Sequence, residues 1–412
     1  MLVHAMAMRA PQTIAARKQE QRAVISGRRT KQVNASHIMH DIWVHRDTTR
    51  VDVARRLGLD KSTVTTIVNE LLAYGVLIET QEGYAGPLGG RRPVHIALNA
   101  EYGCVLGIEL RPRRYIASVV DLHGNEVFTL DGEMEITAGT LTDCAARICE
   151  RVLAEHPAQQ PPLLSVGIGA PGIVDPEAGI IKLSLPLNID TPTTFAPAIS
   201  DRIGLRCFIE NDANAAAWGE LAFHRQRDLS DLLFVLVEIQ EWMERGVLHR
   251  TPVTGLGVVI GGAVHHGRDH FAGEFRSVRA RTSTGRQVSL SPRELDEAVD
   301  DTRLMRRYLG EIAEHVALLA NTMDLTHIFL GGGLEWNEDD VRSLFSRAIQ
   351  ANWPYNGRVP CTVAFSTLGE RAVAYGAAGM VLERAFSDRE MLKEVIIRRP
   401  ETEGAGLSSG AT

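Results

Sequence analysis

The chain has 412 residues, of which 44% are hydrophobic and 23% charged, and its net charge is −7. That length suggests about two to four domains with room for sizeable cores, and the composition is typical of globular proteins. No apolar run approaches the ~18 residues that cross a bilayer, and the N-terminus lacks an apolar signal core, so we expect neither a membrane protein nor an exported one. Five scattered cysteines without a Cys-x-x-Cys pair argue against a disulfide scaffold and favour a cytoplasmic location.

The charge is distributed unevenly along the chain. Residues 1–98 contain 14 Lys and Arg against 8 Asp and Glu, a net charge of +6, whereas the remainder has 30 against 43, a net charge of −13. Such asymmetry predicts an appended module that binds a polyanion. Residues 1–31 are rich in Arg, Lys and Gln with little apolar periodicity, which predicts a basic flexible arm. A short helix is predicted next, over residues 38–44.

Residues 32–98 have the pattern of a helix-turn-helix. A helix is predicted over residues 51–57, where Gly58 stops it, and another over residues 61–74, with Asp60 as its N-cap. The apolar positions of this last helix form one stripe, and the opposite face is short and polar. Two helices joined by a short Gly-containing turn, the second with a polar face, are typical of DNA-binding proteins.

Two strand-like segments, residues 76–80 and 93–98, flank a Gly- and Arg-rich loop and predict a winged variant of this motif. The alternative is a protein-interaction module whose serines and threonines are only solvated. The polar helix, the wing and the positive charge together favour DNA. Basic residues would contact phosphates, and the short polar residues would contact base edges. The predicted DNA-binding residues are Lys61, Ser62, Thr63, Thr65, Thr66, Asn69, Arg91 and Arg92.

From Gly103 onward, apolar strand-like runs alternate with helical stretches, which predicts an α/β architecture. They fall into two cycles, which predict two lobes with a cleft between them. The first cycle comprises residues 105–110, 115–121, 141–154 and 165–174, and the second comprises residues 232–237, 256–260, 311–323, 328–333 and 361–365. The composition of residues 401–412 predicts a disordered tail.

Seven segments of this body are distinctive when taken in order: GIELRPRRYIASVVDLHGNEV, GIGAPGIVD, IENDANAAAWGE, TGLGVVIGGAVHHG, HFAGEF, IFLGGGL and AYGAAG. Together they resemble the ROK family (repressors, open reading frames and kinases), and the N-terminal module resembles that of its repressor branch. The resemblance covers about residues 101–385. It implies an α/β fold in which a winged helix-turn-helix precedes a two-lobed actin/hexokinase-like (ribonuclease H-like) ROK domain over residues 101–390. It also implies a carbohydrate in the cleft and a homodimer or dimer of dimers.

The phosphate-binding residues of a kinase in this family are only partly kept. Such a kinase needs a first loop of Asp-x-Gly-x-Thr type, whose glycines let backbone amides approach phosphate. The corresponding Glu109-Leu-Arg-Pro-Arg113 contains no glycine, and Pro112 removes an amide donor. The resemblance aligns Asp212 with the general base, but without a positioned phosphate we expect no ATP cofactor and no catalytic residue. The alternative is a DNA-tethered ATP-dependent sugar kinase that uses Asp212 as its base.

The resemblance implies a small set of ligand-binding residues in the cleft. Carboxylates and amides can hydrogen-bond sugar hydroxyls. For Asn211 and Asp212, the alternative role is to cap the helix at a strand-to-helix junction. The predicted set is Asn211, Asp212, Glu274 and, on a looser match, Asn188.

No metal site is expected. Ser277 stands where the family has a zinc-binding histidine, and residues 281–291 contain no cysteine. His265, His266 and His270 are more typical of a solvated loop. An insert over residues 238–250 separates two predicted strands and could either contact a partner subunit or pack on its own lobe.

These observations favour a cytoplasmic ROK-type transcriptional regulator, expected to act as a repressor. It would bind operator DNA and sense a carbohydrate without phosphorylating it. A ligand-independent regulator with a vestigial cleft is a third hypothesis.

Overall fold

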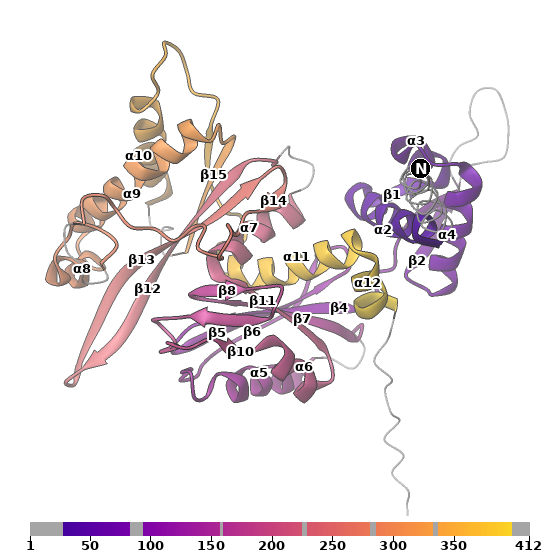
Figure 1. The fold of residues 1–412 in the computed structure, drawn as a ribbon, viewed down its shortest axis with the longest axis horizontal. Helices are drawn as coiled ribbons and strands as arrows, with labels where there is room; N and C mark the ends of the chain where they lie inside the picture. Colours follow the sequence, from indigo (N-terminus) through magenta and orange to yellow (C-terminus); the bar gives the residue numbers. More distant parts are fainter. Residues whose placement is uncertain are drawn as a thin grey trace, which may run out of the picture. The chain divides into compact units, whose positions relative to one another are not determined.

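The computed structural model describes residues 28–82, 94–156, 160–224, 229–280, 286–332 and 337–397. The chain divides into two compact units. Unit 1 comprises the described residues up to Tyr102 together with those from Glu383 onward, and unit 2 comprises those from Gly103 to Leu382. Figure 1 shows the course of the chain through both units. None of the described helices combines the length and the apolar character needed to cross a membrane.

Unit 1 begins with three helices and a small antiparallel sheet of order β1-β3-β2. The elements are α2 (Arg28–His45), β1 (Asp47–Thr49), α3 (Arg50–Leu57), α4 (Lys61–Ala73), β2 (Leu77–Glu82) and β3 (Val94–Leu98). Helix α3 ends at Gly58, whose φ of 63° is left-handed, which glycine adopts without strain. Helix α2 is much longer than the predicted 38–44, and its first residues fall inside the predicted arm. Because their apolar periodicity is weak, sequence pattern alone did not reveal them.

Residues 383–397 complete unit 1. The elements are the last turn of α11 (Ala372–Ser387), α12 (Arg389–Met391) and η3 (Leu392–Ile397). The ring of Phe386 packs edge-on against Trp43 at 4.8 Å between centroids, and the Tyr102 hydroxyl donates to the Ile396 carbonyl at 2.7 Å. The predicted boundary of the effector domain at residue 390 therefore differs from the observed division at Glu383.

The first sheet of unit 2 has the order β11-β7-β4-β5-β6, in which β11, β7 and β4 are parallel and β5 and β6 antiparallel. A three-stranded sheet, β10-β9-β8, accompanies it. The elements are β4 (Cys104–Leu110), β5 (Arg114–Asp121), β6 (Glu126–Glu133), α5 (Leu141–Glu155), β7 (Leu163–Ala170), β8 (Ile173–Asp175), β9 (Ile180–Leu183), β10 (Thr193–Thr194), α6 (Ala196–Ile203), β11 (Arg206–Asn211) and α7 (Asp212–Phe223).

The second sheet has the order β14-β13-β12-β15-β16. Strand β12 pairs antiparallel with β13 and parallel with β15, so this sheet repeats the mixed character of the first. The elements are β12 (Leu232–Glu244), β13 (Val247–Ile260), β14 (Ala263–Val264), α8 (Pro292–Ala298), α9 (Thr302–Thr322), β15 (His327–Gly332), α10 (Glu338–Ala351), β16 (Thr362–Phe365) and η2 (Gly369–Arg371). The first sheet with its helices is called the first lobe, and the second sheet with its helices the second lobe.

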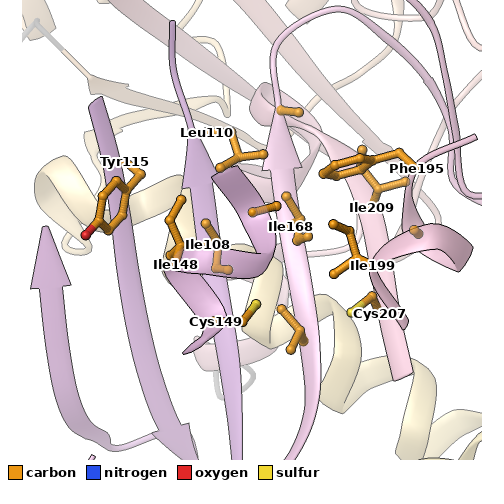
Figure 2. Packing of buried hydrophobic residues seen from close by; sticks show 14 of the residues in the cluster. Ile108, Leu110, Tyr115, Ile148, Cys149, Ile168, Phe195, Ile199, Cys207 and Ile209 are labelled. Carbon is orange, nitrogen blue, oxygen red and sulfur yellow. The ribbon is translucent and has the colours of Figure 1, made fainter. Parts of the chain in front are cut away.

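Apolar layers lie on both faces of each sheet. In the first lobe, α5 and α6 pack on strands such as β4, β7 and β11 through Ile148, Ile199 and their neighbours (Figure 2). Helices α7 and α11 lie between the two sheets and form a third cluster with β12 and β15. Their close approach depends on glycine, since a Cβ atom on Gly107 would lie 1.9 Å from the Ala374 carbonyl oxygen of α11. This packing places the carboxyl end of β11 beside the second sheet.

Candidate functional site

The exposed face of α4 in unit 1 is polar. Its apolar positions, such as Val64 and Ile67, are buried, whereas the predicted contact residues face outward. Lys61, Ser62, Thr65, Thr66 and Asn69 are exposed, and Thr63 is half-buried. Asp60 occupies the N-cap position with extended backbone, but among the described residues its carboxylate accepts no capping hydrogen bond. The first-turn amides of α4 are therefore not covered by the Asp60 side chain, contrary to the prediction.

Two of the predicted contact residues use part of their hydrogen-bonding capacity within the helix. The Thr65 hydroxyl donates to the Lys61 carbonyl at 2.7 Å, and the Thr66 hydroxyl donates to the Ser62 carbonyl at 2.9 Å. Each hydroxyl oxygen keeps its capacity to accept a bond from outside, and its proton is fixed toward the helix. These side chains are consequently better placed to accept than to donate.

Two arginines of α3, which the sequence did not single out, connect elements of unit 1. Arg56 on α3 donates to both carboxylate oxygens of Asp41 on α2, at 2.8 and 2.6 Å, and to the Thr48 hydroxyl at 2.7 Å. Arg50 donates to the Asn69 side-chain oxygen at 3.3 Å and to Glu79 at 2.8 Å. The Asn69 amide is thereby oriented with its oxygen toward α3. Hydrogen bonds between residues far apart in the chain leave no local pattern in the sequence.

A cavity of about 330 Å³ in unit 2 lies at the carboxyl end of β11. Its walls come from both lobes: the β7–β8 turn and the start of α7 on one side, and β13 with the following loop on the other. The predicted residues Asn211, Asp212 and Glu274 all line it. Polar groups converging on a concave site are the usual arrangement for binding a small molecule.

Asn211 has a structural role within this cavity. It is the N-cap of α7, and its side-chain oxygen accepts from the Asn214 amide at 3.1 Å. Its amide nitrogen donates to the Gly172 carbonyl at 2.9 Å. Gly172 has a φ of 114°, and a Cβ atom there would lie 2.3 Å from the Leu183 carbonyl oxygen. Asn211 therefore shapes the cavity wall, as the capping alternative anticipated.

Asp212 is half-buried, and one carboxylate oxygen accepts from the Ala213 amide at 2.7 Å. Burial raises the pKa of Asp212 to about 8, and the carboxylates of Glu238 and Glu274 add to this effect. Burial also raises the pKa of Glu274. At neutral pH the Asp212 carboxyl is therefore mostly protonated, which gives it a donor as well as an acceptor.

Arg111 lies in the turn between β4 and β5. Its guanidinium lies 2.5 Å from a Glu109 oxygen on β4 and 2.9 Å from a Glu238 oxygen on β12. Burial alone would lower the pKa of Arg111, but the two carboxylates raise it overall. Glu109 is 1% exposed, and burial raises its pKa well above the ordinary value, with Arg111 opposing the shift. The Arg111 side chain thus forms an ion pair between the sheets of the two lobes.

Further residues of the cavity were missed by the sequence analysis. Gln287 donates to the Thr254 carbonyl at 2.6 Å and accepts from the Thr254 amide at 2.8 Å, so it continues the edge of β13. The Thr254 hydroxyl instead pairs with the Tyr308 hydroxyl in the core at 2.7 Å. Arg276, Arg286 and His270 also line the cavity. Arg276 and Arg286 follow the AGEF segment, and His270, which precedes it, was interpreted as part of a solvated loop.

Several predicted residues lie elsewhere. Asn188, with a φ of 55°, is exposed and lines a neighbouring cavity of about 880 Å³ rather than the one around Asp212. Arg91 and Arg92, the tail over residues 401–412 and residues 1–27 of the predicted arm lie outside the described residues. Within the described ranges, no three His, Cys, Asp or Glu side chains are grouped so that they could hold a metal ion. His266 instead pairs with the buried Glu210 at 2.8 Å.

Comparison with known proteins relates part of the chain to a known family. Residues 117–285 match the ROK family profile. The chain contains a ROK family domain. A candidate xylose repressor of Caldicellulosiruptor sp. strain Rt8B.4 is 34% identical over 249 residues, and the xylose repressor of Bacillus subtilis strain 168 is 26% identical over 245 residues. Each match covers 59% of this chain, and 58% and 59% of the relative, respectively.

Solved structures show the same fold. A ROK family transcriptional regulator, described as a homologue of the E. coli MLC protein, aligns with a TM-score of 0.67 over 89% of this chain and 99% of its own, at 19% identity. The ROK hexokinase of Thermus thermophilus aligns with a TM-score of 0.53 over 71% of this chain and 99% of its own, at 20% identity. The ROK domain of this chain is therefore an α/β domain of the sugar-kinase-like fold.

Proposed function

We propose that this protein is a ROK-type transcriptional repressor that binds operator DNA through unit 1 and senses a carbohydrate or sugar derivative in the cavity of unit 2. The observation that carries the proposal is the polar outer face of α4, presented after a turn in a unit separate from the cavity. Both curated relatives named above are described as repressors, one of them as a candidate. The similarity spans less than two thirds of the relatives' length. Their names therefore support the proposal of a repressor but do not identify the sugar that this protein binds.

In this proposal, unit 1 is a winged helix-turn-helix, with α3 and α4 as its two helices and β2 and β3 flanking the wing. Helix α4 would lie in the major groove, where its short polar side chains contact base edges. Lys61, with Arg91 and Arg92 of the wing, would contact phosphates. A dimer would bind half-sites about one DNA turn, ~34–36 Å, or a multiple apart.

Fluorescence anisotropy with DNA from upstream of the protein's own coding sequence tests this part. We expect Kd to rise steeply with salt concentration, because phosphate contacts release counterions. The Thr63→Ala/Asn69→Ala variant should lose roughly 5- to 150-fold in specific affinity, since one base contact contributes about 1–3 kcal/mol. Thr191→Ala, an exposed substitution in unit 2, is the control. Binding that is insensitive to salt or to the double substitution would contradict the proposal.

The cavity supports a sensing role over catalysis. Arg111 and its two glutamate partners fill the turn where a phosphate loop would stand, and the Thr254 hydroxyl is engaged in the core. With a pKa of about 8, Asp212 is mostly protonated at neutral pH, when a general base must be ionised. A protonated Asp212 can instead both donate to and accept from sugar hydroxyls, and the Glu274 side chain can accept from them.

A DNA-tethered sugar kinase is the competing proposal, favoured only by the fold shared with sugar kinases. A coupled assay with MgATP and a panel of sugars distinguishes the two. Turnover that disappears in Asp212→Asn would establish the kinase. We expect no turnover, together with a higher melting temperature in the presence of the effector sugar, because a ligand at 100 Kd adds about 2.7 kcal/mol to native stability. If no sugar shifts the melting temperature, the third hypothesis, a ligand-independent regulator, gains support.

A further inference from the structure

The cavity around Asp212 opens into a second, larger one in the same unit. Leu185, Pro186 and Gln240 line both the cavity of about 330 Å³ and the neighbouring one of about 880 Å³. Leu185 and Pro186 come from the first lobe and Gln240 from β12 of the second, so they form the two sides of one passage. The larger cavity is called the outer groove. It adds room to a cavity that by itself lies within the range of about 300–1,000 Å³ usual for small-molecule sites.

Strand β12 gives the outer groove its length. Among the described strands, β15 accompanies β12 only as far as Val237, and the rest of the β12–β13 hairpin extends beyond the second sheet (Figure 1). Alternate residues of a strand share a face, so Glu238, Gln240 and Trp242 follow one another along one face of β12. Glu238 is near enough to Asp212 to act on its charge, and Trp242 lies ~13 Å further along the strand. This face therefore leads from the cavity into the groove.

Trp242 is held in place as a flat surface. Its ring stacks on the ring of His249 from β13, at 5.4 Å between centroids and 19° between planes. His249 in turn lies 3.4 Å from Asp296 of α8, which also accepts from the Arg250 amide at 2.7 Å. Because His249 covers one face of the indole from the β13 side, the other face is directed to the open edge of β12. Trp242 is 43% exposed there and lines the groove. A rigid aromatic ring binds a flat apolar surface at little cost in conformational entropy.

The polar residues of the groove suit a neutral ligand with many hydroxyl groups. Asn188 and Gln240 line it, and their amides can both donate and accept hydrogen bonds. Asn188 is exposed, and it is the one predicted ligand residue that does not lie beside Asp212. Acidic groups outnumber basic ones, which disfavours an acidic ligand. The charged residues that line the groove are Glu133, Glu135, Glu241 and Arg113.

We infer that the effector is a short, linear, neutral oligosaccharide, with its terminal sugar ring in the cavity around Asp212 and the following units in the outer groove. One of these units packs against Trp242. The face of a sugar ring carries C–H groups and its rim carries hydroxyls, so one ring can cover the indole and also reach the amides of Asn188 and Gln240. The path along β12 is longer than a single ring. This inference rests on the proposed function, because it names the class of carbohydrate that the proposed sensor binds.

The melting temperature of the full chain in the presence of sugars is the first measurement. Glucose, xylose, mannose and N-acetylglucosamine are each offered at equal concentration as the monosaccharide and as the linear di- and trisaccharide of the same unit. In one series we expect the melting temperature to rise with chain length, because tighter binding to the native state adds stability. Titration calorimetry of that series should give a Kd about tenfold lower for the trisaccharide than for the monosaccharide, since covering ~60 Å² of apolar surface suffices for this change.

Variants locate the added sugar units. Trp242→Ala should remove the gain in affinity of the longer sugars and leave the Kd of the monosaccharide within about twofold. Trp242→Phe keeps a flat ring and should retain most of the gain. Tyr355→Ala is the control, since Tyr355 is an aromatic residue, 71% exposed, that lines neither cavity. A monosaccharide that binds with no gain from longer chains overturns the inference and leaves the proposed sensor standing. A gain that survives Trp242→Ala overturns the inference as well.

The second test asks whether the cavity and the groove hold one ligand. Asp212→Ala should weaken the monosaccharide and the trisaccharide by the same factor, because the same terminal ring occupies the cavity in both. If the trisaccharide is insensitive to Asp212→Ala, the groove is a separate site with another occupant, such as an extended peptide along the edge of β12, and the inference is overturned. If no sugar of the panel binds, carbohydrate sensing and this inference are contradicted together, whereas the DNA-binding part of the proposed function is judged by anisotropy alone.

Discussion

The ion pair that Arg111 forms between the lobes gives the sharpest stability prediction. Replacing it by methionine keeps an unbranched apolar stem and removes the guanidinium and its charge. Glu109, which is 1% exposed, then keeps its carboxyl group without a cationic neighbour at 2.5 Å. Glu238 loses its partner at 2.9 Å. Arg113 in the same turn is exposed, so Arg113→Met is a matched control.

Removing one partner of a buried ion pair typically costs about 3–5 kcal/mol. Burial already raises the pKa of Glu109, and loss of Arg111 raises it further, so the carboxyl can take up a proton and limit the cost. We therefore expect a loss near 3 kcal/mol at pH 6. A raised pKa in the folded state means that stability is lost as pH increases, so the loss should grow toward pH 8. The control should change by no more than about 0.5 kcal/mol.

Denaturant unfolding at pH 6 and pH 8, followed by calorimetry of the same samples, measures these changes. The double variant Glu109→Gln/Arg111→Met removes both charges and should recover most of the stability, because a neutral amide costs less to bury than an unpaired carboxylate. The reasoning is refuted if Arg111→Met is as stable as Arg113→Met at pH 8. It is also refuted if the double variant is less stable than Arg111→Met.

Three further predictions concern other parts of the chain. Since the pKa of Asp212 is raised to about 8, its contribution to stability is complete below pH ~4 and is lost as pH rises through 8. Asp212→Asn should therefore reduce the decrease in melting temperature between pH 5 and pH 8.5. A decrease as large as that of the unsubstituted protein would count against the raised pKa. Arg56→Met breaks a bidentate pair with Asp41 and should destabilise unit 1 by about 3 kcal/mol, with loss of DNA binding, which proteolysis of unit 1 and anisotropy would detect. Gly107→Ala places a methyl group 1.9 Å from a carbonyl oxygen of α11 and should lower the free energy of unfolding by about 1–3 kcal/mol through overpacking. Gly310→Ala, at a position with open space, should not lower the melting temperature.

Local patterns predicted the regular elements where apolar periodicity was strong. Helix α4 and strand β4 lie within about one residue of their predicted ranges. Helix α4 buries one face and β4 buries both, so each leaves a clear apolar pattern in the sequence. Helix α2 was underestimated, since its first turns carry no apolar stripe. The resemblance to the ROK family rests on motifs that are visible in the sequence. Three of the four predicted ligand residues line one cavity. Asn188 does not, because its position depends on how a loop folds back over the first lobe.

The sequence by itself determined the two-part organisation of charge, the alternation of strands and helices, and the residue types at the carboxyl end of β11. Each of these depends on neighbours in the chain, whose spacing is visible in the sequence. Only the tertiary structure decided that Arg111 pairs with Glu238 on the other sheet, that residues 383–397 belong to unit 1, and that the β12–β13 hairpin extends past β15. Those facts depend on contacts between residues far apart in the chain and on strand register, and the charge of Asp212 depends on the same contacts.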